Sequence, residues 1–250
     1  MKKTKKDPIV VYWCPEPLYA NHELHTLLVN KPEKLFTNVV KNKRTVRYKP
    51  SVSGWVDTDG YHMCEAFKNL SDNTFIYRAP FSVDIQLDKE GMIQESLNSV
   101  FFGNRIGSFE DCYAIDFFAA NTFFCEEPLE ISITPPYMHQ TSQPEYGFIC
   151  SVKYDIGRWF RPMVMIYQLW KDKNKIYFQK DEPLAYYHFH TDREVKLVQF
   201  VPNKKIKSIA GACLYYKTVI PFQPLDVLYK KFVENNINKQ LIAEIKQNLL

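Results

Sequence analysis

Glycine is scarce in this chain, which has 8 glycines and 15 prolines among its 250 residues. The sequence contains neither a Gly-x-Gly-x-x-Gly nor a Gly-x-x-x-x-Gly-Lys-Ser/Thr pattern, the glycine-rich loops that bind phosphates through backbone N–H groups. These absences exclude nucleotide binding by such a loop. The many prolines instead favour turns that end strands.

Long apolar runs and paired cysteines are also missing. No apolar run approaches the roughly 20 residues that a membrane-spanning helix needs, and no apolar segment follows the basic start MKKTKKDP, as a secretory signal would require. The six cysteines form no Cys-x-x-Cys pair, and most of them lie in apolar stretches. We therefore expect reduced core cysteines, a cytoplasmic location and no association with a membrane.

Aromatic residues make up 15% of the chain, as expected for the interior of a β-sandwich. The segment from Trp159 to Pro202 contains four apolar or alternating runs that are separated by the polar turns KDKN and QKDEP. These runs predict strands at Met163–Trp170, Lys175–Phe178, Leu184–His190 and Val195–Val201. Alternation with a period of two predicts further strands at Val83–Leu87 and Leu129–Thr134. The sequence therefore predicts a mainly β protein with an antiparallel sandwich, jelly-roll or β-clip-like body.

The C-terminal part has a different pattern. From residue 225 the apolar residues follow the helical period, and the main stripe consists of Leu228, Phe232, Leu241 and Ile245. This stripe predicts packing on the β body or across a dimer interface. We expect three parts: a disordered basic tail over residues 1–8, a single β domain over residues 9–222 and a helical segment over residues 223–250.

Positive charge is concentrated near the N-terminus. Residues 1–50 hold 11 of the 32 Lys and Arg residues but only 4 of the 28 Asp and Glu residues. Five of these cations lie between Lys41 and Lys49. Lysines at a loop or strand edge commonly serve solubility, and five cations provide few phosphate contacts. The sequence predicts nucleic-acid binding that is weak at most.

Two histidines are placed to share a ligand. His188 and His190 lie two residues apart in a predicted strand, which puts both side chains on one face. Such a pair can supply two imidazoles to one metal ion, and Asp192 extends it to a His-x-Asp triplet. A third imidazole would have to come from His62 or His139. The alternative is that both histidines make ordinary hydrogen bonds on a strand. The sequence predicts no catalytic residue and no cofactor-binding residue.

Residues 55–202 resemble an uncharacterised β-rich family found in cyanobacterial tailed phages and scattered bacteria. The similarity rests on Gly54-Trp55, Phe102-Gly103, Ile131–Pro135, Trp159–Pro162 and Phe178-Gln-Lys-Asp-Glu-Pro-Leu. In the last motif Asp181 stands where the family has a glycine, which questions the tight turn at that position. Residues 176–201 also resemble the closing strands of the dUTPase-type β-clip, but the catalytic Gly-Val-Ile-Asp-x-x-Tyr motif of that family is missing.

Together these features predict a non-enzymatic binding or assembly protein that needs no cofactor. The phage resemblance implies that it acts in the host cytoplasm, where it would associate with itself or with a protein partner. The alternative is a metal-dependent or nucleotide-directed enzyme on a jelly-roll or β-clip body, with His188 and His190 at its site.

Overall fold

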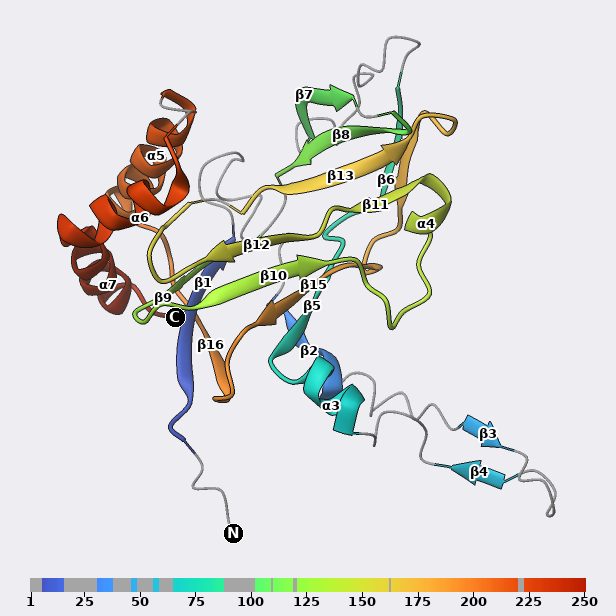
Figure 1. Cartoon of the computed structure of the whole chain (residues 1–250), viewed down its shortest axis with the longest axis horizontal. Helices are drawn as coiled ribbons and strands as arrows, with labels where there is room; N and C mark the ends of the chain where they lie inside the picture. The colour runs from blue at the N-terminus through green and yellow to red at the C-terminus, as the bar shows by residue number, and fades with distance from the viewer. Residues whose placement is uncertain are drawn as a thin grey trace.

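The computed structural model describes residues 6–15, 31–37, 46–48, 56–58, 65–87, 102–108, 110–118, 121–161, 163–219 and 223–250. In these ranges the chain is mainly β, with several antiparallel sheets and a group of helices at its C-terminal end (Figure 1). The predicted fold class is therefore confirmed. No described helix is long and apolar enough to cross a membrane.

Three sheets form most of the body. The five-stranded sheet contains, in spatial order, β12 (Val152–Asp155), β10 (Glu130–Thr134), β15 (Pro183–Phe189), β5 (Thr74–Arg78) and β2 (Glu33–Lys34). The four-stranded sheet contains β11 (Gly147–Ile149), β13 (Met165–Trp170), β8 (Cys112–Phe117) and β7 (Phe102–Ser108). The three-stranded sheet contains β16 (Val195–Gln199), β1 (Ile9–Pro15) and β9 (Asn121–Cys125). Two further pairs are β14 (Lys175–Phe178) with β6 (Val83–Gln86) and β3 (Val46–Tyr48) with β4 (Val56–Thr58).

Period-two alternation correctly identifies β6 and β10. In β6 the side chains of Val83 and Ile85 are buried while Asp84 and Gln86 are exposed. Inward-facing residues of the three sheets and of the β14–β6 pair form one core cluster. Aromatic rings within it pack edge to face, as Phe123 does on Tyr187 at a centroid distance of 5.0 Å.

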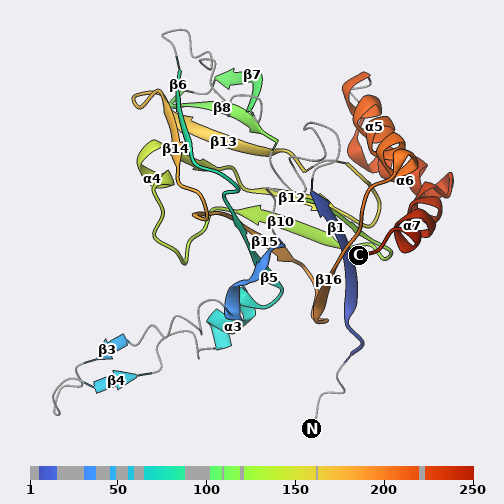
Figure 2. The ribbon, with the colours of Figure 1, turned by 180° about the vertical axis from the view of Figure 1, so that it is seen from behind.

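The four strands predicted between residues 159 and 202 are all present as β13, β14, β15 and β16, but each belongs to a different sheet. In addition, β16 pairs in parallel with β1, with Ile9 opposite Val195 and Trp13 opposite Gln199 (Figure 2). The other described strand pairs are antiparallel. Alternation of side chains identifies a strand, but it does not identify the partner of that strand.

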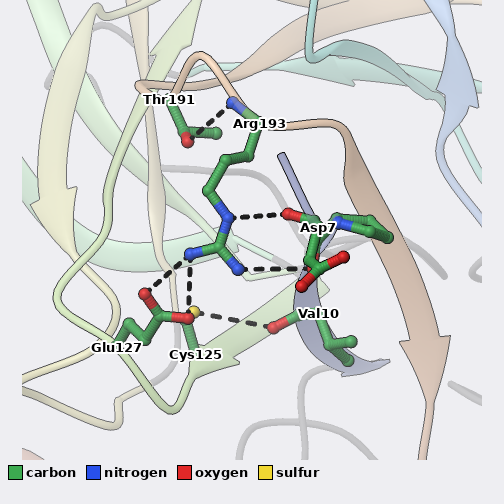
Figure 3. A network of polar contacts seen from close by, with 7 residues as sticks. Asp7, Val10, Cys125, Glu127, Thr191 and Arg193 are labelled. Carbon is green, nitrogen blue, oxygen red and sulfur yellow. Dashed lines mark hydrogen bonds and ion pairs between the residues drawn. The ribbon is translucent and has the colours of Figure 1, made fainter. Parts of the chain in front are cut away.

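Arg193, which precedes β16, anchors the start of β1 (Figure 3). Its Nε donates to the carbonyl oxygen of Asp7 at 2.8 Å, and its Nη1 donates to the carboxylate oxygens of Glu127 at 2.8 and 3.0 Å. Lys6 forms an ion pair with Asp192 at 2.5 Å. Residues 6–8 therefore contact the segment before β16, and residues 1–5 of the predicted tail lie outside the described ranges.

A second apolar cluster covers the other face of the five-stranded sheet. Tyr186 of β15 and Ile76 of β5 are fully buried there against Leu35 and against Phe67 of α3 (Glu65–Ser71). Leu35 and Phe67 come from segments far from β15 in the sequence, so a strand pattern alone cannot reveal that they cover this face.

Three helices, α5 (Lys204–Val219), α6 (Leu225–Glu234) and α7 (Ile237–Gln247), form what we call the helical module. It begins at Lys204, earlier than the predicted boundary at residue 223, because α5 was not predicted. The predicted stripe packs on the β body. The stripe consists of Leu228, Phe232, Leu241 and Ile245. These residues share one buried cluster with four aromatic residues of the β body, Tyr12, Phe124, Phe160 and Phe200.

Candidate functional site

Helices α5, α6 and α7 enclose a groove with a volume of about 330 Å³, which we call the helical groove. Its apolar lining includes Trp159 from the β body, Ile209 of α5, Leu228 and Phe232 of α6, and Ile237 of α7. The ring of Trp159 lies 5.6 Å from that of Phe232, so one side of the groove is built from packed aromatic rings. A volume of this size is at the lower end of the range for ligand sites in proteins.

Small residues of α5 leave the space that forms the groove. Ser208 and Ala212 lie one turn apart and both line it. A Cβ atom added to the neighbouring Gly211 would meet no atom within 4 Å. The sequence reasoning missed this groove because it missed α5. The signal that could have revealed it is the cluster of small residues Ser208, Ala210, Gly211 and Ala212, which follows three lysines at positions 204, 205 and 207.

The helical module is strongly basic. Residues 204–250 contain eight lysines and three acidic residues, which gives a net charge of +5. Three of the lysines have acidic partners, in the pairs Lys205–Glu244, Lys230–Glu234 and Lys246–Glu126. No acidic partner lies among the described residues for Lys204, Lys207, Lys231 or Lys239. Since Lys231 also lines the groove, the entrance to this apolar space carries positive charge.

The groove offers no activated nucleophile. Its titratable lining residues are Cys213, Tyr216 and Lys231. Burial raises the pKa of the Cys213 thiol to about 12, so the thiol stays protonated and unreactive at neutral pH. Cys213 is also one of five free cysteines in the described ranges, and Cys64 lies outside them. The chemistry of the groove suits non-covalent binding.

The structure brings the predicted histidine pair together on the five-stranded sheet. His188 of β15 lies opposite Ser132 of β10 and Thr74 of β5. His190 follows the strand, and its backbone N–H donates to the carbonyl oxygen of Glu130 at 2.9 Å. The two imidazole rings have their centroids 4.7 Å apart and are nearly perpendicular, at 86°.

Hydroxyl groups from neighbouring strands hold both rings. Thr74 Oγ1 lies 2.7 Å from His188 Nδ1 and donates its one proton to the carbonyl oxygen of Leu70 at 3.0 Å. When this hydroxyl donates its hydrogen bond to Leu70, it accepts a hydrogen bond from Nδ1, and His188 Nε2 then carries the lone pair. Ser132 Oγ lies 2.6 Å from His190 Nε2. Burial, together with the neighbouring His190 ring, lowers the pKa of His188 and favours its neutral form.

Among the described residues, no predicted third ligand lies at this pair. Asp192 instead forms the ion pair with Lys6, and His139 Nδ1 lies 2.5 Å from the hydroxyl of Tyr186. His62 lies outside the described residues. Among the residues that the structure describes, no group of three or more His, Cys, Asp or Glu side chains could hold a metal ion. The His-x-Asp triplet is thus not assembled.

The basic cluster of residues 41–49 is described only in part. Arg47 of β3 lies opposite Asp57 of β4 in an antiparallel pair. Lys41, Lys43, Arg44 and Lys49 lie outside the described residues. Weak nucleic-acid binding at this cluster stays a prediction.

Comparison with known proteins identifies no relative. No family model, no curated protein and no solved structure matches this chain. The resemblances to the phage family and to the dUTPase-type β-clip therefore stay predictions. The function has to be argued from the contacts and charges of the chain itself.

Proposed function

We propose that this chain is a non-enzymatic binding or assembly protein, and that its helical groove binds an acidic, amphipathic segment of a partner protein. The observation that carries the proposal is an apolar groove between helices whose entrance is positively charged. Grooves of this kind typically bind an amphipathic helix through apolar anchor residues spaced by three or four positions.

The shape and lining of the groove support a helical occupant. Ser208 and Ala212 present little bulk, so a partner helix could approach the backbone of α5 closely. Next to them Tyr215 and Tyr216 are 63% and 51% exposed. Exposed tyrosines provide rigid, amphipathic contact area, which makes them frequent anchors in protein interfaces. The aromatic surface beside Trp159 could then hold an apolar side chain of the partner.

Charge decides between the possible occupants. A second copy bound through the same face would bring two modules of net charge +5 together, and this repulsion opposes self-association. An acidic partner would instead be attracted by Lys204, Lys207, Lys231 and Lys239, for which the described residues provide no acidic partner. Nucleic acid would meet the same lysines, but its phosphates would gain nothing from an apolar cavity. The combination therefore favours an acidic protein segment.

The proposal can be tested with two designed helical peptides. Both carry leucine and phenylalanine on one face, and the other face carries glutamate in one peptide and lysine in the second. We expect fluorescence anisotropy to show that the glutamate peptide binds more tightly, with a preference that weakens as salt is added. Equal binding of the two peptides, or tighter binding of duplex DNA, would contradict the proposal.

Variants then locate the site. Lys231→Glu should weaken binding of the glutamate peptide by about fivefold or more, equivalent to about 1 kcal/mol, because Lys231 lines the groove. Lys196→Glu on β16 changes the net charge equally but lies outside the groove, so it serves as the matched control. Ala212→Trp should block the groove by filling it. Equal effects of the two charge reversals, or a dimer that Ala212→Trp dissociates in sedimentation, would refute the proposed occupant.

A further inference from the structure

We propose that His188 and His190 form a binding site for a divalent transition-metal ion, with Cu²⁺ and Ni²⁺ preferred, through His188 Nε2 and His190 Nδ1. This site is independent of the helical groove, because it is built on the five-stranded sheet from β15, β10 and β5. A negative result for the metal site would therefore not contradict the proposed peptide binding in the helical groove, and the reverse also holds.

The separation of the two rings fits two ligands of one ion. Imidazole nitrogens bind such ions at about 2.0–2.1 Å, so two rings at a right angle around one ion have centroids about 4.6 Å apart. A tetrahedral angle would place them about 5.3 Å apart. The observed separation of 4.7 Å is closer to the value for a right angle than to the tetrahedral value. Right angles belong to the square-planar and octahedral geometries of Cu²⁺ and Ni²⁺ rather than to tetrahedral Zn²⁺.

The hydrogen bonds around the pair are those that metal-binding histidines need. A histidine ligand commonly donates its other ring N–H to a fixed acceptor, which sets the tautomer and the ring orientation. Thr74 accepts from His188 Nδ1 in this way, and Ser132 contacts His190 Nε2. The nitrogens left over are His188 Nε2 and His190 Nδ1.

The rest of the coordination shell would be water. No third His, Cys, Asp or Glu ligand completes a group with the pair among the described residues. Glu130, whose backbone lies beside His190, is paired through its carboxylate with Lys153 at 2.7 Å. A site with two imidazoles and several waters binds more weakly than a structural site with four protein ligands. We therefore expect reversible binding that a chelator removes without unfolding the protein.

Isothermal titration calorimetry on untagged, chelator-treated full-length protein tests this site. A histidine tag has to be absent because it binds the same ions. We expect one Cu²⁺ ion per chain, weaker binding of Ni²⁺, weaker still of Zn²⁺ and none of Mg²⁺. Electron paramagnetic resonance of the Cu²⁺ form should show nitrogen ligation. The absence of Cu²⁺ binding, or tighter binding of Zn²⁺ than of Ni²⁺, would overturn the proposal.

Four variants assign the ligands. His188→Ala and His190→Ala should each weaken Cu²⁺ binding by about tenfold or more, whereas the control His139→Ala should leave it unchanged, since His139 contacts Tyr186 instead. Thr74→Val removes the acceptor of His188 Nδ1 and should cost about tenfold or more in affinity. If Thr74→Val does not fold, Ser132→Ala replaces it. Equal effects of His139→Ala and His188→Ala would refute the site.

Discussion

Asn73 offers a sharp test of how this fold is held together. Its backbone is left-handed, with φ of 53°, and it lies in the turn between α3 and β5. Its side-chain Nδ2 donates to the carbonyl oxygens of Thr191 at 2.9 Å and Arg193 at 2.7 Å. Its Oδ1 accepts from the backbone N–H of Val195 at 2.9 Å. One side chain thus joins this turn to the connection between β15 and β16.

The expected loss can be worked out from these three bonds. Asn73→Gly keeps the left-handed conformation without steric cost but removes all three hydrogen bonds. Each is worth about 0.5–1.5 kcal/mol, so the free energy of unfolding should fall by about 3 kcal/mol. Asn73→Ala should lose about 1 kcal/mol more, because its Cβ disfavours this conformation. For a domain stabilised by about 5–15 kcal/mol, the change is large.

Urea unfolding followed by tryptophan fluorescence measures this loss, provided that the m value stays constant. Asn174→Gly is the matched control. Asn174 is also left-handed, with φ of 45°, and its side chain makes no hydrogen bond within the described ranges. We expect a change of less than about 0.5 kcal/mol for this control. The reasoning is refuted if Asn73→Gly costs no more than Asn174→Gly.

Three further predictions concern single positions. Asp181 has a left-handed backbone with φ of 65°, so Asp181→Gly should leave the melting temperature unchanged or raise it. Asp181→Ala should lower the free energy of unfolding by about 1 kcal/mol. A lower melting temperature in both variants would contradict this prediction. Gly211→Ala should stabilise α5 by about 0.5–1 kcal/mol, because the added Cβ meets no atom within 4 Å; a lower melting temperature would show otherwise. Burial raises the pKa of Cys150, and it raises that of Cys125 to about 11 and that of Cys213 to about 12, so at mildly alkaline pH iodoacetamide should modify the partly exposed Cys150 before Cys125 or Cys213. Mass spectrometry that finds Cys213 modified in the native protein would refute this.

Local patterns were sufficient to locate many of the strands. In β6 and β10 one face is buried and the other is polar, so the period of two is visible in the sequence. Pairing depends on contacts between distant segments. Nothing near Ile9 indicates that its partner is Val195, and the parallel pairing of β1 with β16 was therefore not predictable.

Two local features were misjudged for physical reasons. Helix α5 lacks a single apolar stripe, because its apolar residues are spread around the helix axis, and so the helical period was weak. At the turn after β14 the sequence has Asp181 where a glycine was expected. The turn forms nonetheless, with the N–H of Asp181 donating to the carbonyl oxygen of Ala79 at 2.9 Å. Aspartate is among the few residues with a side chain that tolerate the left-handed region.

For the candidate sites too, the sequence indicated which neighbouring residues share a face, but it did not indicate their partners from distant segments. Strand geometry alone placed His188 and His190 on one face, and the structure brings their rings together. Their hydroxyl partners could not be foreseen, since Thr74 is 114 residues from His188 and Ser132 is 58 residues from His190. The helical groove was equally inaccessible, because it exists only where three helices and Trp159 meet.

The histidine pair should also change how the free energy of unfolding depends on pH. Burial, and then the neighbouring His190, lower the pKa of His188 in the folded protein. The unfolded chain, with a histidine pKa of about 6.5, therefore binds more protons than the folded chain as the pH falls through this value. Stability is retained above about pH 6.5 and declines below it. Other groups on the same face also carry charge, Glu130 and Lys153 among them.

A difference between two proteins isolates the contribution of His188. His188→Gln keeps a side-chain amide that can donate to Thr74 but cannot be protonated in this range. Urea unfolding at about pH 7.5 and about pH 5.5 should show a smaller loss of stability in the variant than in the parent chain. An equal loss in both proteins would mean that His188 is as easily protonated in the folded state as in the unfolded state. Burial beside His190 would then not lower the pKa of His188, contrary to what its position on β15 leads us to expect.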